Sequence, residues 1–229
     1  MGAVDDATKR RAAEAGFAFL APGMRVGLGT GSTASVFVRL LGERVRQGLD
    51  IVGVPTSERT RELAGQCGIP LSTLELTPVL DVTVDGADAF DAELNLIKGG
   101  GGALLGEKVV AAASARLVIL ADHRKRVSTL AEVPLPVEVV PFAWRPVADR
   151  LAALGGRPTI RSDSTGARYL TDQGNYIMDC VFGTLPDPAA LDQRLNAIPG
   201  VVEHGLFVDM ASVVLMGSPA GVEVFERRR

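Results

Sequence analysis

A run of four glycines separates a lysine from a glutamate within the segment Lys98-Gly99-Gly100-Gly101-Gly102-Ala103-Leu104-Leu105-Gly106-Glu107-Lys108. Glycine loses more conformational freedom on folding than any other residue, so four in succession indicate backbone N–H groups that contact a ligand. Glu107 lies on a mostly apolar helical stripe, with Ala103, Val110 and Ser114 at three- and four-residue spacing. Burial there would raise the pKa of its carboxyl group and make it a proton acceptor near neutral pH. The alternative is a solvated glutamate paired with a neighbour, but the glycine run and the lysine favour the base.

A second glycine-rich segment, Gly27-Leu28-Gly29-Thr30-Gly31-Ser32-Thr33-Ala34, lies between an apolar strand and a helix. Backbone N–H groups at a helix N-terminus, glycines that allow close approach and three hydroxyl groups form an anion site suited to phosphate. A tight strand-to-helix turn without a ligand is the plainer alternative.

The same segment also matches a dinucleotide-binding fingerprint through Gly29, Gly31 and Ala34. That interpretation requires an acidic residue at the end of the second strand, where the chain has Val54-Pro55-Thr56. A P-loop is excluded because no Gly-Lys pair follows. A phosphate group is therefore the anion that this segment suits best.

Two carboxylates follow the next apolar strand, in Asp85-Gly86-Ala87-Asp88. Open α/β sheets bind ligands at the carboxyl ends of their parallel strands. Asp85 and Asp88 could there bind sugar hydroxyls or move hydroxyl protons. An aspartate-rich turn is the alternative, and a divalent cation is a third, without supporting histidines.

Lysine is scarce, which makes each lysine a candidate for a specific contact. Of the 24 basic residues, only Lys9, Lys98, Lys108 and Lys125 are lysines. Lys125 follows another strand in Asp122-His123-Arg124-Lys125, where its compact ammonium could bind phosphate; a solvated loop is the alternative. Lys9, on the first helix, is a weaker candidate, and Ser57 is expected to cap a helix.

The composition excludes several classes of function. The 229 residues are 47% apolar with a net charge of −3, so the chain can bury a core and has no global field for nucleic acid. Two separated cysteines, Cys67 and Cys180, and two histidines do not suggest a zinc site. The N-terminal segment is polar and no apolar stretch reaches membrane-spanning length, so we expect a cytoplasmic protein.

Alternating helices and strands must position these residues. We expect helices over residues 5–20, from the glycine-rich turn to about 47, 57–66 and 101–113, with strands over 24–29, 50–55, 79–86 and 116–122. Asp5 or Asp6 could cap the first helix. The near-continuous apolar strands are typical of a parallel sheet covered on both faces. A Rossmann-like α/β domain of residues 1–130 and 206–229 is the prediction.

Residues 131–205 follow a different order, β-α-β-β-α-β, which is typical of a smaller ferredoxin-like α+β domain. The expected strands are 134–143, 157–162, a pair of 168–173 and 175–182 turning at Gln173-Gly174, and 200–207; the helices are 145–156 and 187–197. The apolar segment 211–227 should return to the first sheet. The smaller domain is assigned an oligomerisation role.

Taken together, these motifs resemble the type A family of ribose-5-phosphate isomerases. The matching segments, in family order over about residues 5 to 208, are GLGTGSTA, PTSERT, DVTVDGAD, KGGGGALLGEKVVA, the Asp122–Lys125 loop, PLPVEVVPFA, TDQGNYIMD and PGVVEHGLF. The resemblance implies interconversion of D-ribose 5-phosphate and D-ribulose 5-phosphate in the pentose phosphate pathway. It also implies a homodimer or homotetramer that uses neither a metal nor an organic cofactor and has no nucleic-acid or membrane partner.

Carried over by motif, Glu107 would move a proton between C2 and C1 through an enediolate, and Lys98 with the N–H groups after it would stabilise the oxyanion. Asp85 and Asp88 would bind the sugar hydroxyls and assist ring opening and hydroxyl proton transfer. The implied substrate-binding set is Thr30, Gly31, Ser32, Thr33, Asp85, Gly86, Ala87, Asp88, Lys98, Gly99, Gly100, Gly101 and Lys125, with Lys9 as a helper. The chain departs from the family pattern at Ala89, Gly106 and His123-Arg124.

Three other functions are compatible with parts of this pattern. A non-catalytic sugar-phosphate sensor would need a DNA-binding module, and an amino-sugar deaminase would release ammonia from glucosamine 6-phosphate. A dinucleotide-binding protein would bind NAD. The joint presence of base, oxyanion donor and phosphate site favours the isomerase.

Overall fold

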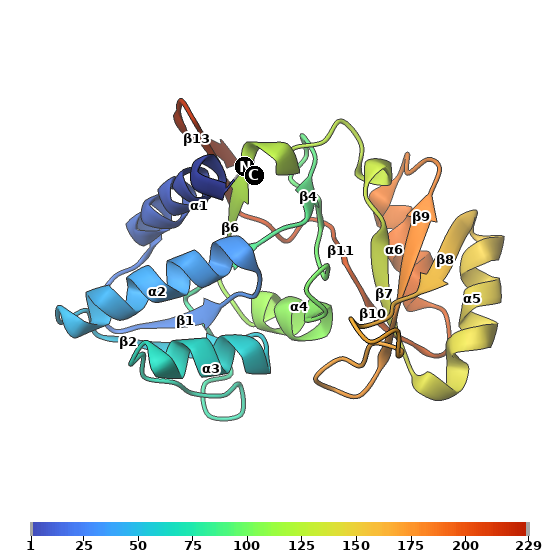
Figure 1. Ribbon diagram of the computed structural model, residues 1–229, viewed down its shortest axis with the longest axis horizontal. Helices are drawn as coiled ribbons and strands as arrows, with labels where there is room; N and C mark the ends of the chain where they lie inside the picture. The colour runs from blue at the N-terminus through green and yellow to red at the C-terminus, as the bar shows by residue number, and fades with distance from the viewer. Residues whose placement is uncertain (1, 228–229) are drawn as a thin grey trace.

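The largest of three sheets forms the frame of the molecule in the computed structural model, which describes residues 2–227 (Figure 1). Residues 1, 228 and 229, at the ends of the predicted first domain, lie outside the described residues. The strand order is β13-β12-β6-β3-β1-β2. The strands are β1 (Met24–Leu28), β2 (Ile51–Pro55), β3 (Val82–Gly86), β6 (Leu117–Asp122), β12 (Val213–Ser218) and β13 (Gly221–Glu226). All neighbours are parallel except β13, which forms an antiparallel hairpin with β12.

Both faces of the sheet are buried along its central strands β3, β6 and β12, as their continuous apolar residues predict, whereas the edge strand β13 is largely exposed. Along β6, Val118 and Leu120 face one apolar cluster, whereas Leu117 and Ile119 face another. The helices are α1 (Gly2–Gly16), α2 (Ser32–Arg46), α3 (Glu58–Gln66) and α4 (Leu104–Ala112). The predicted return of the C-terminal segment to this sheet is confirmed by β12 and β13.

The prediction that Asp5 or Asp6 caps the first helix is wrong. Helix α1 begins at Gly2, so Asp5 and Asp6 lie inside it, and a single 3-10 turn, Phe17–Phe19, completes the predicted span. Other one-turn helices are His123–Lys125, Leu130–Glu132 and Pro141–Ala143.

A four-stranded antiparallel sheet with the order β10-β7-β9-β8 forms the second unit. Its elements are β7 (Leu135–Val139), α5 (Trp144–Ala153), β8 (Gly156–Ile160), β9 (Tyr176–Phe182), α6 (Pro188–Asn196) and β10 (Val201–His204). This succession is the predicted β-α-β-β-α-β order. Helices α5 and α6 pack on one face of the sheet through Val147, Leu151 and Leu195.

Residues 168–173 do not form the predicted strand. Strand β9 pairs with β7 on one side and β8 on the other, so no edge of β9 is left for a further partner. The segment is a loop, held by a bond from the Tyr169 N–H to the Arg161 carbonyl and one from the Thr171 N–H to the Asn175 carbonyl.

A small sheet joins the two units. Its order is β11-β5-β4, formed by β4 (Ala89–Phe90), β5 (Leu96–Ile97) and β11 (Leu206–Phe207). Helix α4 lies between the large sheet and the second unit (Figure 1) and contacts β3, β7 and β10. Strand β5, which precedes the glycine run, is therefore held in the small sheet, and helix α4, which follows the run, is held by contacts with both units.

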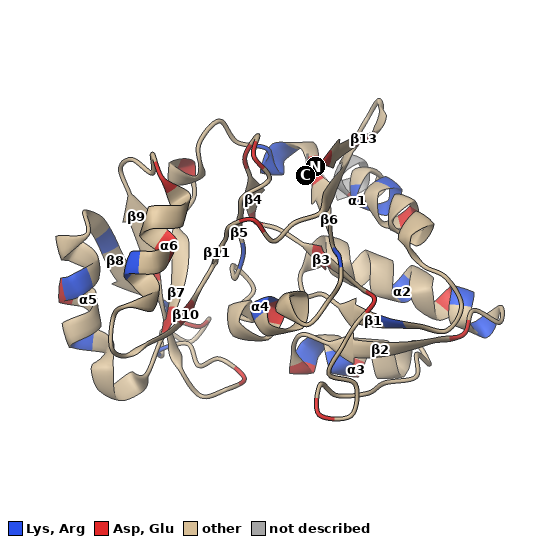
Figure 2. Ribbon diagram, turned by 180° about the vertical axis from the view of Figure 1, so that it is seen from behind, with Lys and Arg blue, Asp and Glu red and all other residues tan. Residues whose placement is uncertain are grey.

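Basic and acidic residues are interspersed along the outer helices α2, α3 and α5 (Figure 2). Among the described residues, no helix is long and apolar enough to cross a membrane.

Candidate active site

The site lies between β1 and β3, two neighbouring parallel strands from which the chain leads to opposite edges of the large sheet. Strand β1 lies between β2 and β3, so the connections that follow β1 and β3 leave a crevice at their carboxyl ends, the usual ligand position in such sheets. A pocket that is open to solvent occupies this position. Its lining residues are Thr30, Gly31, Ser32, Thr33, Gly86, Ala87, Asp88, Lys98, Gly99, Gly101, Glu107 and Lys125.

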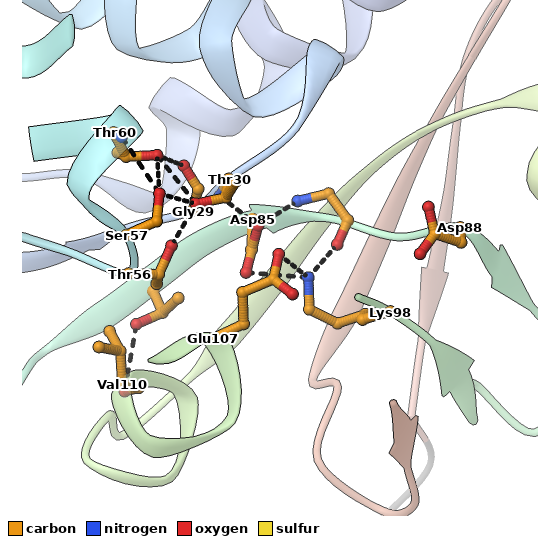
Figure 3. Close-up of polar contacts among 12 residues, drawn as sticks. Gly29, Thr30, Thr56, Ser57, Thr60, Asp85, Asp88, Lys98, Glu107 and Val110 are labelled. Atoms are coloured by element: carbon orange, nitrogen blue, oxygen red, sulfur yellow. Dashed lines mark hydrogen bonds and ion pairs between the residues drawn. The ribbon is translucent and has the colours of Figure 1, made fainter. Parts of the chain in front are cut away.

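An ammonium group between two carboxylates forms the floor of the pocket (Figure 3). The Lys98 Nζ lies 2.9 Å from Asp85 Oδ2 and 3.0 Å from Glu107 Oε1. It also donates to the Gly86 carbonyl at 2.6 Å. All three side chains are buried, and Asp85 is fully covered.

Backbone contacts fix Asp85 and Lys98, the two charged neighbours of Glu107. Asp85 Oδ1 accepts hydrogen bonds from the N–H groups of Thr30 and Gly86, at 3.0 and 2.7 Å. Only glycine fits at position 29, because a Cβ there would lie 2.0 Å from Asp85 Oδ1. The Lys98 N–H donates to the Gly205 carbonyl, which fixes Lys98 at the end of β5. The lysine is therefore held by segments distant in sequence.

Burial and the neighbouring charges favour Glu107 as a proton acceptor. Burial raises the pKa of Glu107 to about 8; Lys98 opposes this rise, and the charge of Asp85 adds to it. Burial alone would lower the pKa of Lys98, but Asp85 and Glu107 together outweigh it, so the pKa lies above its ordinary value. Burial also raises the pKa of Asp85, against the attraction of Lys98.

One oxygen of Glu107 is free for chemistry. Oε1 accepts from Lys98, whereas the buried Oε2 has no hydrogen-bond partner within the described protein. A buried carboxylate oxygen without a partner is costly, and it lies in a residue that borders a pocket. The arrangement can take a proton from a bound ligand and return it nearby.

The other end of the pocket is built to hold an anion. Helix α2 begins at Ser32, so the N–H groups of its first turn and the hydroxyls of Ser32 and Thr33 are at the pocket wall. Lys125 brings a positive charge from the turn after β6. In that turn Arg124 pairs with Asp122 at 2.9 Å.

The Thr30 hydroxyl has a different role from its neighbours. It lies 2.8 Å from the Thr56 hydroxyl, 2.6 Å from that of Ser57 and 2.9 Å from that of Thr60. This cluster ties the turn after β1 to the start of α3 (Figure 3). Ser57 also accepts from the Thr60 N–H, which confirms the predicted helix cap.

The glycine run uses some of its N–H groups internally. Gly100 donates to Asp88 Oδ2 at 2.7 Å, and Gly102 donates to the Gly99 carbonyl at 3.0 Å. Gly99 and Gly101 line the pocket. Asp88 lies apart from the Lys98 group (Figure 3) and fixes the run at the mouth of the pocket.

The remaining predicted residues have distinct positions. Lys9 is on α1 and is not among the lining residues; the preceding Thr8 carbonyl lies against Gly217, near the carboxyl end of β12. Ala89 is fully buried in β4. Gly106 packs on the Thr56 carbonyl, 2.1 Å from where a Cβ would be, so a larger residue would require α4 to move.

Sequence reasoning missed the support provided by Thr56, Thr60 and Gly205. The only signal for the hydroxyls was their density in PTSERT, and Gly205 carried none because its partner, Lys98, is far away in sequence. No group of three or more potential metal ligands is present among the described histidine, cysteine, aspartate and glutamate residues.

Comparison with known proteins gives a consistent result over nearly the whole chain. The model of the ribose 5-phosphate isomerase A (phosphoriboisomerase A) family matches residues 52–221. Ribose-5-phosphate isomerase A of Parvibaculum lavamentivorans is 52% identical over 227 residues, covering 96% of this chain and 98% of the relative. That of Agrobacterium fabrum is 51% identical over 224 residues, covering 95% and 96%.

Solved structures of ribose-5-phosphate isomerases also superpose on nearly the whole chain. A D-ribose-5-phosphate isomerase in complex with phospho-erythronic acid superposes with a TM-score of 0.95 at 40% identity, covering 98% of this chain and 99% of that one. Ribose 5-phosphate isomerase A from Methanocaldococcus jannaschii gives a TM-score of 0.93 at 40% identity, covering 97% and 99%.

Proposed function

The chain belongs to the ribose 5-phosphate isomerase A family, and on that premise we propose how its residues interconvert D-ribose 5-phosphate and D-ribulose 5-phosphate. The observation that carries the proposal is the unpartnered Glu107 Oε2 beside the Lys98 ammonium, across a pocket from an anion site. The substrate phosphate binds at the start of α2 with Ser32, Thr33 and Lys125. The aldehyde end then reaches Glu107.

Glu107 acts as the base. It removes the proton from C2 of open-chain ribose 5-phosphate while the C1 carbonyl becomes an enediolate oxygen. The proton of the C2 hydroxyl passes to the C1 oxygen with the help of Asp88, which lines the pocket, and Glu107 delivers its proton to C1 as C2 becomes a carbonyl. Its raised pKa makes the ionised form a stronger base than an ordinary glutamate. Lys98 stabilises the negative charge that develops on the oxygen.

The two aspartates handle the hydroxyl groups. Asp88, at the mouth of the pocket, binds sugar hydroxyls and assists ring opening. Asp85 lies below the pocket, where its charge holds Lys98 protonated and fixes the ammonium. Glycines 99–101 place their backbone next to the reacting carbons, and Gly86 and Ala87 form the adjacent wall; Lys9 is a weaker helper near the phosphate.

The test is direct measurement of ribulose 5-phosphate formed from ribose 5-phosphate, with and without EDTA. We expect activity in both conditions, because every proposed step uses side chains of this chain. Lack of activity in both would contradict the assignment. Ammonia release from glucosamine 6-phosphate or binding of NAD in the same preparation would point to another function.

The proposed domains are residues 1–130 with 206–229, which carry the pocket, and residues 131–205, which mediate homodimer or homotetramer formation. An exposed apolar surface on the smaller unit supports this role: Phe142 is 98% exposed and adjoins Val140, Ala143, Pro146 and Pro199. Sedimentation of the Phe142→Glu variant should yield a smaller species than the wild type. An unchanged assembly would exclude this surface. A cytoplasmic location is part of the same proposal.

A further inference from the structure

Arg161, from the second unit, reaches the glycine run of the site. Its Nη1 donates to the Gly99 carbonyl at 2.9 Å and to the Gly100 carbonyl at 3.3 Å. The residue directly follows β8, more than 60 positions along the chain from the run. The side chain is only 14% exposed, and the bond to the Gly99 carbonyl is partly buried, whereas the bond to the Gly100 carbonyl lies at the surface.

The guanidinium is itself fixed from a third segment. Asp179 on β9 accepts from both Nε and Nη2, a bidentate pair in which the Nε distance is 2.9 Å. The Tyr169 ring lies 5.9 Å from the guanidinium carbon. Tyr169 also packs on the run, since its hydroxyl would be 2.1 Å from a Cβ at Gly102. Arg161 therefore has little freedom to turn away from the two carbonyls.

These contacts determine where the N–H groups of the run point. In a trans peptide the C=O and the N–H are on opposite sides of the chain, and no described peptide bond is cis. With the Gly99 and Gly100 carbonyls held by Arg161, the N–H groups of Gly100 and Gly101 are directed to the other side. The Gly100 N–H accordingly donates to Asp88, and Gly101 lines the pocket.

We propose that Arg161 is a positioning residue for the isomerisation: it orients the peptides of Gly99 to Gly101 so that their N–H groups serve Asp88 and the developing oxyanion. Its charge next to the carbonyl oxygens also polarises these peptides and strengthens the N–H groups as donors. Residues 131–205 thus contribute to catalysis without touching the substrate. The inference rests on the proposed function, because an oxyanion forms only if the enediolate does.

The decisive variant is Arg161→Ala, compared with Arg157→Ala as the matched control. Arg157 is an exposed arginine on the same strand, β8, and is not among the residues that line the pocket. For Arg161→Ala we expect kcat to fall roughly 10- to 100-fold, the range for a misplaced catalytic group, with KM nearly unchanged. Arg157→Ala should match the wild type.

Two readouts distinguish positioning from a general loss of structure. Added guanidinium ion should restore part of the kcat of Arg161→Ala and leave Arg157→Ala unaffected. Phospho-erythronic acid, whose carboxylate resembles the charged enediolate, should inhibit Arg161→Ala less strongly than the wild type, whereas inhibition by inorganic phosphate should not change.

Arg161→Lys covers the case in which the alanine variant fails to fold. Lysine keeps the charge but cannot bind Asp179 in a bidentate manner and both carbonyls together, so we expect an intermediate kcat. Wild-type kcat in Arg161→Ala, or in the folded Arg161→Lys when Ala fails, would overturn the inference. A rise in KM and in the phosphate inhibition constant with constant kcat would also overturn it. Loss of activity in the wild type itself would instead refute the proposed function.

Discussion

Two lysines have similar surroundings and different proposed roles: Lys98, which is buried, and Lys108 on helix α4, whose side chain is 12% exposed. Lys98 pairs with Asp85 and Glu107, whereas Lys108 donates to Glu203 and to the His204 carbonyl, both at 2.7 Å. Both ammonium groups lie near the same Phe207 ring, at 5.5 and 4.9 Å from its centroid. Burial and ion pairing are therefore common to the catalytic and the structural cluster.

The difference is which groups remain available. At Lys98 two carboxylates outweigh burial and raise the pKa of the lysine, and Glu107 keeps an unpartnered oxygen at the pocket. At Lys108 burial outweighs Glu203 and lowers the pKa, and burial likewise lowers that of His204 to about 3, which keeps the ring neutral. Neither Lys108 nor Glu203 lines the pocket. Lys98 thus differs from Lys108 in its ion pairs with Asp85 and Glu107 and in its position at a pocket, since Asp192 and Glu203 also act on Lys108.

Replacing Glu107 or Glu203, one glutamate from each cluster, by glutamine should give the largest difference in kcat. Glu107→Gln keeps the size of the side chain but cannot accept the proton, so kcat should fall about 10²- to 10⁴-fold or more with a modest change in KM. Glu203→Gln should retain kcat. Steady-state kinetics of both variants is the check, and equal losses would remove the distinction between the clusters.

Replacing each lysine by methionine should distinguish an effect on activity from an effect on stability. Lys98→Met removes the oxyanion donor, which we expect to lower kcat roughly 10²- to 10³-fold. It should also move the acidic limb of the pH profile upward, because Lys98 lowers the pKa of Glu107. A kcat within a few-fold of the wild type would show that the lysine stabilises no charge in the transition state.

Lys108→Met should act mainly on folding. Glu203 would lose its cation in a site where it is 18% exposed, so we expect the free energy of unfolding to fall by about 2 kcal/mol. Denaturant titration measures the loss. The kcat of the folded protein should stay close to the wild-type value, and a loss as large as that of Lys98→Met would place Lys108 in the catalytic group.

The smallest effect should be a shift in pH dependence. With ionised Glu107 as the proposed base, kcat/KM should rise with pH through the pKa of about 8. The charge of Asp88 contributes to that raised pKa, so Asp88→Asn should move the rise to lower pH. A shift to higher pH would contradict the assigned electrostatics.

Local patterns predicted residues that the structure brings together at one pocket. The spacing of Glu107 placed it on a buried helical stripe, and parallel strands brought Asp85 and the turn after β1 to one edge. The supports of these groups were not predictable, because Gly205 and Arg161 act through partners far away in sequence. The loop at 168–173 has strand-like alternation, but β9 has both edges occupied and Thr171 bonds the buried Glu138 instead.

The central claim, that Glu107 moves a proton in an enediolate mechanism, is tested most directly by running the reaction in D₂O and determining the deuterium at C1 of ribulose 5-phosphate. Wild type and Glu203→Gln should incorporate solvent deuterium at C1 at similar rates, and Glu107→Gln should incorporate almost none in the same time. Incorporation by Glu107→Gln at the wild-type rate would contradict the account, because the proton would then reach C1 without the proposed base.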